Sequence, residues 1–176
     1  MGDRRGAAGS EGSRRAHAAG PAGELSEALG QERPDALQQL RGLVDGFEGI
    51  PHVPPPASLT ATLRPYQEAG IRWMCWLGEN RLGGILADDM GLGKTLQALC
   101  ALAHLGGPSL VVAPTSVLRA WEREAARFLP QLKVCIYHGA QRTLDPSADL
   151  VVTTYALLRL DNVLQERDWN CVVLDE

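Results

Sequence analysis

An α/β fold, in which helices flank a parallel sheet and a disordered extension comes first, is predicted by three features of the sequence. Short apolar runs alternate with helical patterns from Leu59 to the end of the 176-residue chain. One of these runs leads into a glycine-containing loop that closes on Lys94-Thr95. Residues 1–23 are rich in Gly, Ala and Arg and have almost no large apolar side chains. Alternating strands and helices form parallel sheets through right-handed crossovers.

The composition is that of an ordinary globular protein, with 45% hydrophobic and 22% charged residues. The net charge of −4 provides no global basic field, so any contact with nucleic acid has to come from a local patch. The four cysteines are far apart and lack the spacing of metal ligands, which favours a reducing compartment. No apolar run is long enough to span a bilayer, so we expect no membrane partner.

Residues 1–58 are predicted to form a disordered or weakly helical extension. Residues 1–23 bury too little apolar surface to offset the entropy of ordering. Within 24–47, apolar residues recur at helical spacing, although a proline and two glycines interrupt them. This segment is either a helix for a partner or a marginal helix that packs loosely. Residues 51–56 are predicted to be a stiff, proline-rich linker.

The globular part, residues 59–176, is predicted to begin with a helix, because Pro65 suits the first helical position. One face of this helix carries Tyr66, Gly70, Trp73 and Leu77. Residues 84–87 are then expected to form a strand that leads into the glycine-containing loop.

The loop is predicted to bind phosphate. Gly91 and Gly93 can adopt positive φ, which turns backbone N–H groups toward an anion. The helix expected over 96–105 adds its N-terminal amides and the positive end of its dipole. Lys94 can reach the terminal phosphates, and the Thr95 hydroxyl can hold Mg²⁺. The candidate nucleotide-binding residues are therefore Asp89, Met90, Gly91, Leu92, Gly93, Lys94 and Thr95.

Asp88 stands where the common phosphate-loop pattern has its first glycine. The stretch Asp88-Asp89-Met90-Gly91-Leu92-Gly93-Lys94-Thr95 resembles motif I of the Snf2 family, the double-stranded DNA translocases of helicase superfamily 2. Motif I of DEAD-box RNA helicases usually differs. The resemblance implies a RecA-like sheet, ATP and Mg²⁺ as cofactors, and double-stranded DNA as a partner.

Four later apolar runs are predicted to be strands, at 110–113, 133–137, 150–155 and 171–174. Between them we expect a helix that opens at Pro114-Thr115-Ser116, with Thr115 or Ser116 as its N-cap, and a second helix over 156–164. The first of these helices places Val117, Trp121, Ala125 and Phe128 on one side.

Two segments resemble the parts of the family that contact DNA. Residues 113–118, followed by Trp121-Glu122, resemble motif Ia, which implies that Pro114, Thr115 and Ser116 face the DNA backbone; an ordinary capped helix is the alternative. Thr153 and Thr154 lie where relatives make further DNA contacts. They are also β-prone residues at a strand end, which is the alternative interpretation.

Gln67 falls in a stretch that resembles the Q-motif region of the family. The resemblance implies that its amide, which has one donor and one acceptor group, recognises the edge of adenine. The alternative is a solvent-exposed glutamine on a helix.

The last stretch, Cys171-Val172-Val173-Leu174-Asp175-Glu176, resembles motif II, an apolar strand that ends in two acids. Parallel strands bring their carboxyl ends to one edge, which places Asp175 and Glu176 beside the phosphate loop. Asp175 is expected to hold Mg²⁺ through its water shell, and Glu176 to orient the attacking water. Together with Lys94, these two are the candidate catalytic residues.

We therefore interpret the chain as the N-terminal part of the first RecA-like lobe of an ATP-dependent DNA translocase. A second RecA-like lobe is absent from these 176 residues, so turnover by this chain alone stays open. The alternatives are a nucleotide-binding module or gene fragment without turnover, and an RNA helicase of the same superfamily. The use of Arg in place of Lys fits a GC-rich bacterial gene, which implies a cytoplasmic, nucleoid-associated protein; a eukaryotic source implies a nuclear one.

Overall fold

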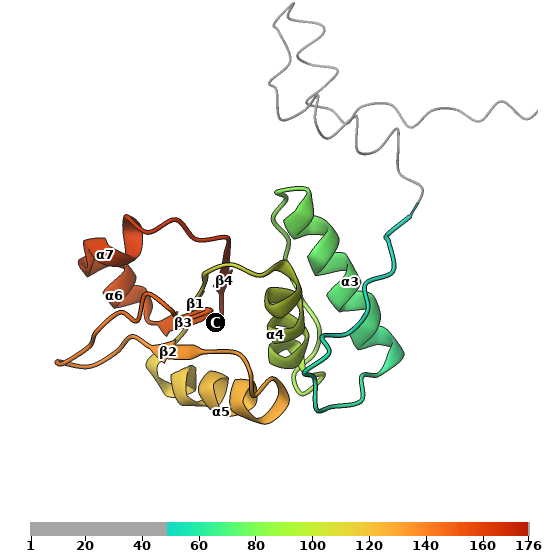
Figure 1. The fold of residues 1–176 in the computed structure, drawn as a ribbon, viewed down its shortest axis with the longest axis horizontal. Helices are drawn as coiled ribbons and strands as arrows, with labels where there is room; N and C mark the ends of the chain where they lie inside the picture. The colour runs from blue at the N-terminus through green and yellow to red at the C-terminus, as the bar shows by residue number, and fades with distance from the viewer. Residues whose placement is uncertain (1–48, 176) are drawn as a thin grey trace, which may run out of the picture. The chain divides into compact units, whose positions relative to one another are not determined.

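The structure is a computed structural model that describes residues 49–175 (Figure 1). The predicted disorder at 1–23 and the predicted helix within 24–47 lie outside the described residues. The proline-rich stretch 51–56 contains neither helix nor strand.

The centre of the described fold is a four-stranded parallel sheet with the order β2-β3-β1-β4. Its strands are β1 (Ser109–Val112), β2 (Val134–Ile136), β3 (Leu150–Thr153) and β4 (Cys171–Leu174). Ser109 of β1 is in register with Leu150 on one side and Cys171 on the other, so β1 and β3 are interior strands and both are fully buried. Strand β4 is an edge, and its Val172 and Leu174 are 48% and 65% exposed.

Helices cover both faces of the sheet (Figure 1). The described helices are α3 (Pro65–Glu79), α4 (Lys94–Leu105), the 3₁₀ turn η1 (Thr115–Val117), α5 (Leu118–Phe128), α6 (Tyr155–Leu160) and α7 (Asn162–Gln165). On one face, side chains of α4 and α5 pack against Val111 and Val152; on the other, side chains of α6 and α7 pack against Leu110 and Val151. Helix α3 packs against α4. This arrangement confirms the predicted α/β fold with a helix-flanked parallel sheet.

The contact between α3 and α4 is apolar and includes two thiols. Ile71, Cys75 and Cys100 are buried there. Burial raises the pKa of both thiols to about 11, so they remain protonated at neutral pH. Cys75 and Cys100 therefore pack as small apolar side chains.

Helix α3 buries Gln67, Ile71 and Cys75, and the face that carries Tyr66, Gly70, Trp73 and Leu77 lies next to these residues. One expectation for the first half of the domain was wrong. Residues 84–87 form no strand, because no described strand lies beside them to complete the backbone hydrogen bonds; Ile85 is 87% exposed.

Two further expectations concern helix boundaries. Neither Thr115 nor Ser116 is the N-cap of α5, because the chain first makes the η1 turn and Val117 takes the cap position. The helix expected over 156–164 is two short helices, α6 and α7. Asp161 separates them with an extended backbone (φ −108°, ψ 105°).

Candidate nucleotide and DNA site

The direction of α4 places the phosphate loop at one edge of the sheet. Leu102 and Ala103, in its last turn, line a hollow of about 240 Å³ together with Asp149 and Leu150, at the amino end of β3. A helix of twelve residues is about 18 Å long. Lys94 and Thr95, at the other end of α4, therefore lie away from the amino end of β3, and Asp175 follows the carboxyl end of β4.

The loop before α4 is closed by its own lysine. Lys94 Nζ donates to the backbone carbonyls of Asp88 (2.7 Å) and Asp89 (3.1 Å). Gly91 and Gly93 adopt the positive φ values that the sequence predicted, 81° and 76°. Among the described residues, no group accepts a hydrogen bond from the amides of Gly93, Lys94 or Thr95. Free helix amides beside an ammonium group fit a phosphate chain.

The Leu92 carbonyl ties this loop to α3. It accepts hydrogen bonds from Tyr66 Oη (3.2 Å) and Gln67 Nε2 (3.1 Å). The other half of the Gln67 amide, Oε1, accepts from the Arg64 amide at 3.0 Å. Gln67 is only 8% exposed, so the alternative of a solvent-exposed glutamine was wrong. Its recognition of adenine stays a prediction.

Gln97 is a residue of the site that sequence reasoning missed. It is fully buried on α4, and its Nε2 donates to the Asp88 carboxylate at 3.2 Å. Gly70 on α3 leaves the room for this side chain, because a Cβ there would collide with Gln97 Oε1. The signal in the sequence that could have indicated Gln97 is its position three residues after Lys94, in the first turn of the helix that follows the loop. Gln97 thus fixes Asp88, the residue that replaces the first glycine of the loop.

Asp175 follows β4 and is held in a defined orientation. Its amide donates to the Val112 carbonyl (2.8 Å), and its Oδ2 accepts from Trp121 Nε1 (2.8 Å). Among the described residues, none donates to Oδ1, which is left for a water of a metal shell. Mg²⁺ typically takes one or two carboxylates along with substrate phosphates, so Thr95 and Asp175 suit it. Glu176 lies outside the described residues.

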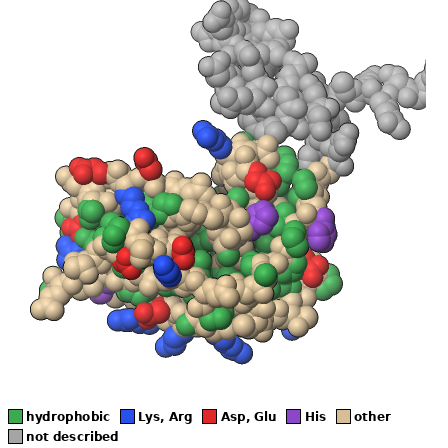
Figure 2. Space-filling model, viewed as in Figure 1, with side chains coloured by type: hydrophobic (Ala, Val, Ile, Leu, Met, Phe, Trp, Pro, Cys, Tyr) green, Lys and Arg blue, Asp and Glu red, His purple; other side chains and the backbone are tan. Residues whose placement is uncertain are grey.

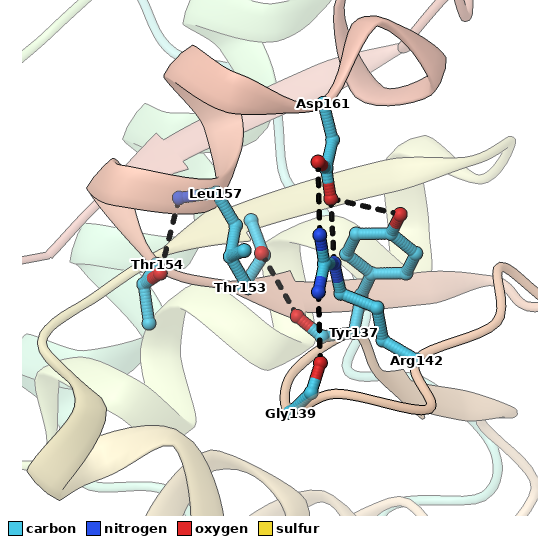
Figure 3. A network of polar contacts seen from close by, with 7 residues as sticks. All are labelled: Tyr137, Gly139, Arg142, Thr153, Thr154, Leu157 and Asp161. Carbon is cyan, nitrogen blue, oxygen red and sulfur yellow. Dashed lines mark hydrogen bonds and ion pairs between the residues drawn. The ribbon is translucent and has the colours of Figure 1, made fainter.

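The predicted DNA contacts differ in accessibility. Thr115 and Ser116 are exposed on η1, and Pro114 is half-buried. Thr153 is fully buried and its hydroxyl donates to the Tyr137 carbonyl at 3.0 Å (Figure 3). Thr154 is the N-cap of α6, and its hydroxyl accepts from the Leu157 amide at 3.3 Å. The hydroxyls of Thr153 and Thr154 therefore already have partners, and DNA contact by either remains a prediction.

One family model, that of the SNF2-related domain, matches residues 66–176, which include the phosphate loop, η1 and Asp175. The chain belongs to this family. The match starts at the second residue of α3 and covers the whole described sheet. The resemblance noted in motif I is confirmed at the level of the family.

Similar proteins include large relatives of the SNF2-related family. Helicase SWR1 of Mycosarcoma maydis is 42% identical over 137 residues, which are 69% of this chain and 8% of that protein. YwqA of Bacillus subtilis (strain 168), a putative ATP-dependent helicase/translocase, is 38% identical over 159 residues, 81% of this chain and 17% of YwqA. This chain therefore spans less than a fifth of either relative.

Solved structures agree with the SNF2-related assignment. The Sulfolobus solfataricus SWI2/SNF2 ATPase core in complex with dsDNA is 39% identical, with a TM-score of 0.67. The alignment covers 72% of this chain and 28% of that one. The ATPase core domain of the same organism gives a TM-score of 0.68 at 38% identity. These neighbours confirm the RecA-like fold class.

In this SNF2-related domain, an ion pair joins the loop after β2 to the α6–α7 junction (Figure 3). Arg142 Nε and Nη2 donate to the two carboxylate oxygens of Asp161 at 2.6 and 3.0 Å, and Arg142 Nη1 donates to the Gly139 carbonyl. Tyr137 Oη adds a third hydrogen bond to Asp161. The Arg142 guanidinium holds the pKa of the Asp161 carboxyl below its usual value. The pair also explains why the helix breaks at Asp161.

A basic stripe on α5 provides a local patch that the overall charge does not suggest. Arg119, Arg123 and Arg127 recur every four residues on the exposed side of the helix. Arg119 also pairs with Glu122 at 2.7 Å. Figure 2 shows Lys and Arg side chains along the lower edge of the view, over α5. The spacing of four is the signal in the sequence that could have found this stripe.

Proposed function

We propose that this domain is the ATP-binding lobe of a Snf2-type, ATP-dependent double-stranded DNA translocase, which couples ATP hydrolysis to movement on DNA. The observation that carries the proposal is the loop before α4, in which Lys94 Nζ lies beside helix amides that have no acceptor among the described residues. The Sulfolobus solfataricus ATPase core was solved in complex with dsDNA, which supports the choice of nucleic acid. A second RecA-like lobe is part of the proposal for the whole enzyme.

Different residues of the chain bind the phosphates and the metal of Mg-ATP. The loop amides and Lys94 hold the phosphates, and Thr95 and the free oxygen of Asp175 hold the metal through its shell. Bound Mg²⁺ neutralises charge that develops on the phosphates. Glu176 orients the attacking water. Pro114, Thr115 and Ser116 follow the DNA backbone, and the α5 stripe adds positive charge beside η1. Thr154, the N-cap of α6, marks a second approach of the backbone, and buried Thr153 supports that turn from the end of β3.

Gln67 is expected to select ATP over GTP, because the two purines present donor and acceptor in opposite order. Gln67→Ala should lower the ATP-to-GTP affinity ratio by about tenfold, since each hydrogen bond contributes about 0.5–1.5 kcal/mol. Competition of both nucleotides against a fluorescent ATP analogue measures the ratio. Tyr66→Phe is the matched control: it also removes a donor to the Leu92 carbonyl, and should weaken both nucleotides alike. An unchanged ratio in Gln67→Ala rejects the adenine role.

Duplex DNA is expected to bind this domain more tightly than an RNA duplex of the same length and sequence, because A-form RNA presents a different groove. Fluorescence anisotropy at a series of salt concentrations measures both, and affinity should fall with salt. Ser116→Glu places a negative charge at the proposed phosphate contact, so it should weaken DNA binding and leave the ATP analogue unaffected. Preference for RNA would support the RNA helicase alternative. Nucleotide binding without any nucleic-acid binding would support a nucleotide-binding module.

For location, we propose the compartment that holds the DNA. That is the bacterial cytoplasm, at the nucleoid, if the gene is bacterial, or the nucleus if it is eukaryotic; relatives occur in both kinds of organism. Within residues 49–175, no helix combines the length and apolar character needed to cross a bilayer.

A further inference from the structure

Asp175 is hydrogen-bonded by three elements at once. Its amide donates to the Val112 carbonyl, just after which β1 ends, and its carboxylate accepts from Trp121 Nε1 of α5. Its backbone carbonyl accepts from Tyr155 Oη of α6 at 2.8 Å. The last two partners are side chains. They lie on the two helices that begin at the proposed DNA contacts.

Trp121 moves with the segment that starts at η1. Its side chain is 3% exposed and packs in the core with Leu118 and Ala125, which lie on the same helix, α5. Helix α5 follows η1 without a break, and Ser116 lies five residues before Trp121. A phosphate held at Thr115 and Ser116 therefore acts on the element that carries the indole donor of Asp175.

Tyr155 gives the second connection. It is the first residue of α6, directly after the N-cap Thr154. Its ring is 42% exposed, and its hydroxyl nevertheless donates to the backbone of Asp175, twenty residues along the chain. The backbone position of Asp175 therefore depends on where α6 begins.

We infer that Trp121 and Tyr155 are positioning residues that make the orientation of the Asp175 carboxylate depend on DNA bound at η1 and at the start of α6. This inference rests on the proposed function, because it links the two ligands of that function, Mg-nucleotide and duplex DNA. Trp121 holds Oδ2 and so sets the direction of Oδ1, the oxygen that would face the water shell of a bound Mg²⁺. A change in α5 alters that direction, because the bond from the indole to the carboxylate is charge-assisted, short and directional. A change at the start of α6 alters it through the backbone of Asp175, to which Tyr155 donates.

The consequence is a reciprocal coupling between two binding events. Duplex DNA should change the affinity for Mg-ADP, and Mg-ADP should change the affinity for DNA by the same factor. We expect a factor of about five or more, as for other coupled sites. The measurement is titration of the 176-residue chain with Mg-ADP, with and without a saturating DNA duplex, and the reverse titration.

Two variants separate coupling from binding. Tyr155→Phe removes one hydroxyl from a partly exposed ring, and Trp121→Phe removes the indole donor. Each should move the coupling factor toward one while both ligands still bind. Trp169→Phe is the matched control, because its indole donates to the Leu164 carbonyl at 2.7 Å, not to Asp175. Its coupling factor should equal that of the wild type.

The indole N–H resonance of Trp121 gives a readout that is independent of nucleotide affinity and of fold stability. In a ¹⁵N-labelled chain, Asp175→Asn should shift this resonance, which Trp121→Phe assigns, and DNA alone should shift it in the wild type. Coupling that survives in both Tyr155→Phe and Trp121→Phe overturns the inference, and so does binding of both ligands without coupling in the wild type. A wild-type chain that binds neither ligand overturns the proposed function itself.

Discussion

Lys94→Ala is expected to weaken binding of an ATP analogue by about tenfold to a hundredfold. A hydrogen bond to a charged group contributes about 1.5–3 kcal/mol, and 1.4 kcal/mol corresponds to a factor of ten. In the structure the ammonium group already lies within the loop, on the carbonyls of Asp88 and Asp89, so it needs only to exchange these acceptors for phosphate oxygens. Fluorescence titration in the presence of Mg²⁺ measures the dissociation constant.

Lys133→Ala is the control for this change, because Lys94 and Lys133 are the only lysines of the chain. Lys133 is exposed and directly precedes β2, so it is not part of the phosphate loop. The control should bind like the wild type. If Lys94→Ala binds as tightly as Lys133→Ala, Lys94 is not part of a nucleotide site and the proposed function loses its central residue.

Gly93→Ala is expected to weaken the same analogue by more than tenfold, and by more than Gly91→Ala. Both glycines have positive φ, which costs an L-residue about 1–2 kcal/mol. Only at Gly93 would the new Cβ also meet another group, Gln67 Nε2, at 2.7 Å; nothing lies within 4 Å of a Cβ at Gly91. Displacement of that amide removes its hydrogen bond to the Leu92 carbonyl, which costs about another 1 kcal/mol.

The same titration separates the backbone strain of a positive φ from the collision of the new Cβ with Gln67 Nε2. Gly91→Ala supplies the strain without the collision, so the difference between the two variants isolates the contact with Gln67. Equal losses would mean that the link from α3 to the loop contributes nothing to nucleotide binding. Circular dichroism should show that both variants keep their helices, since neither glycine lies inside one.

Much of the sheet was predictable from local sequence. Strands β1 and β3 each contain three consecutive apolar residues, as is typical of strands buried on both faces, and each lies within one or two residues of its predicted bounds. The loop conformation at Gly91 and Gly93 was equally readable, since positive φ favours glycine. These features depend on neighbouring residues only.

The parts that were missed depend on residues far apart in the chain. The apolar run at 84–87 has strand composition, yet a strand exists only where a second strand supplies its hydrogen bonds. The break at Asp161 is fixed by Arg142, and the orientation of Asp175 by Trp121, 54 residues earlier. Gln67 took the buried position on α3 because its amide finds partners in Arg64 and Leu92. None of these pairings leaves a periodic pattern in the sequence.

Strand β4 has a consequence for the behaviour of the chain in solution. Within residues 49–175 no strand pairs with its outer edge, and it exposes Val172 and Leu174 on one face. An apolar edge of this kind is a template for pairing between molecules. The sequence Cys171-Val172-Val173-Leu174 contains no proline or charge to oppose such pairing. Concentrated samples are therefore expected to self-associate along β4 into aggregates, and dilute samples to stay dispersed.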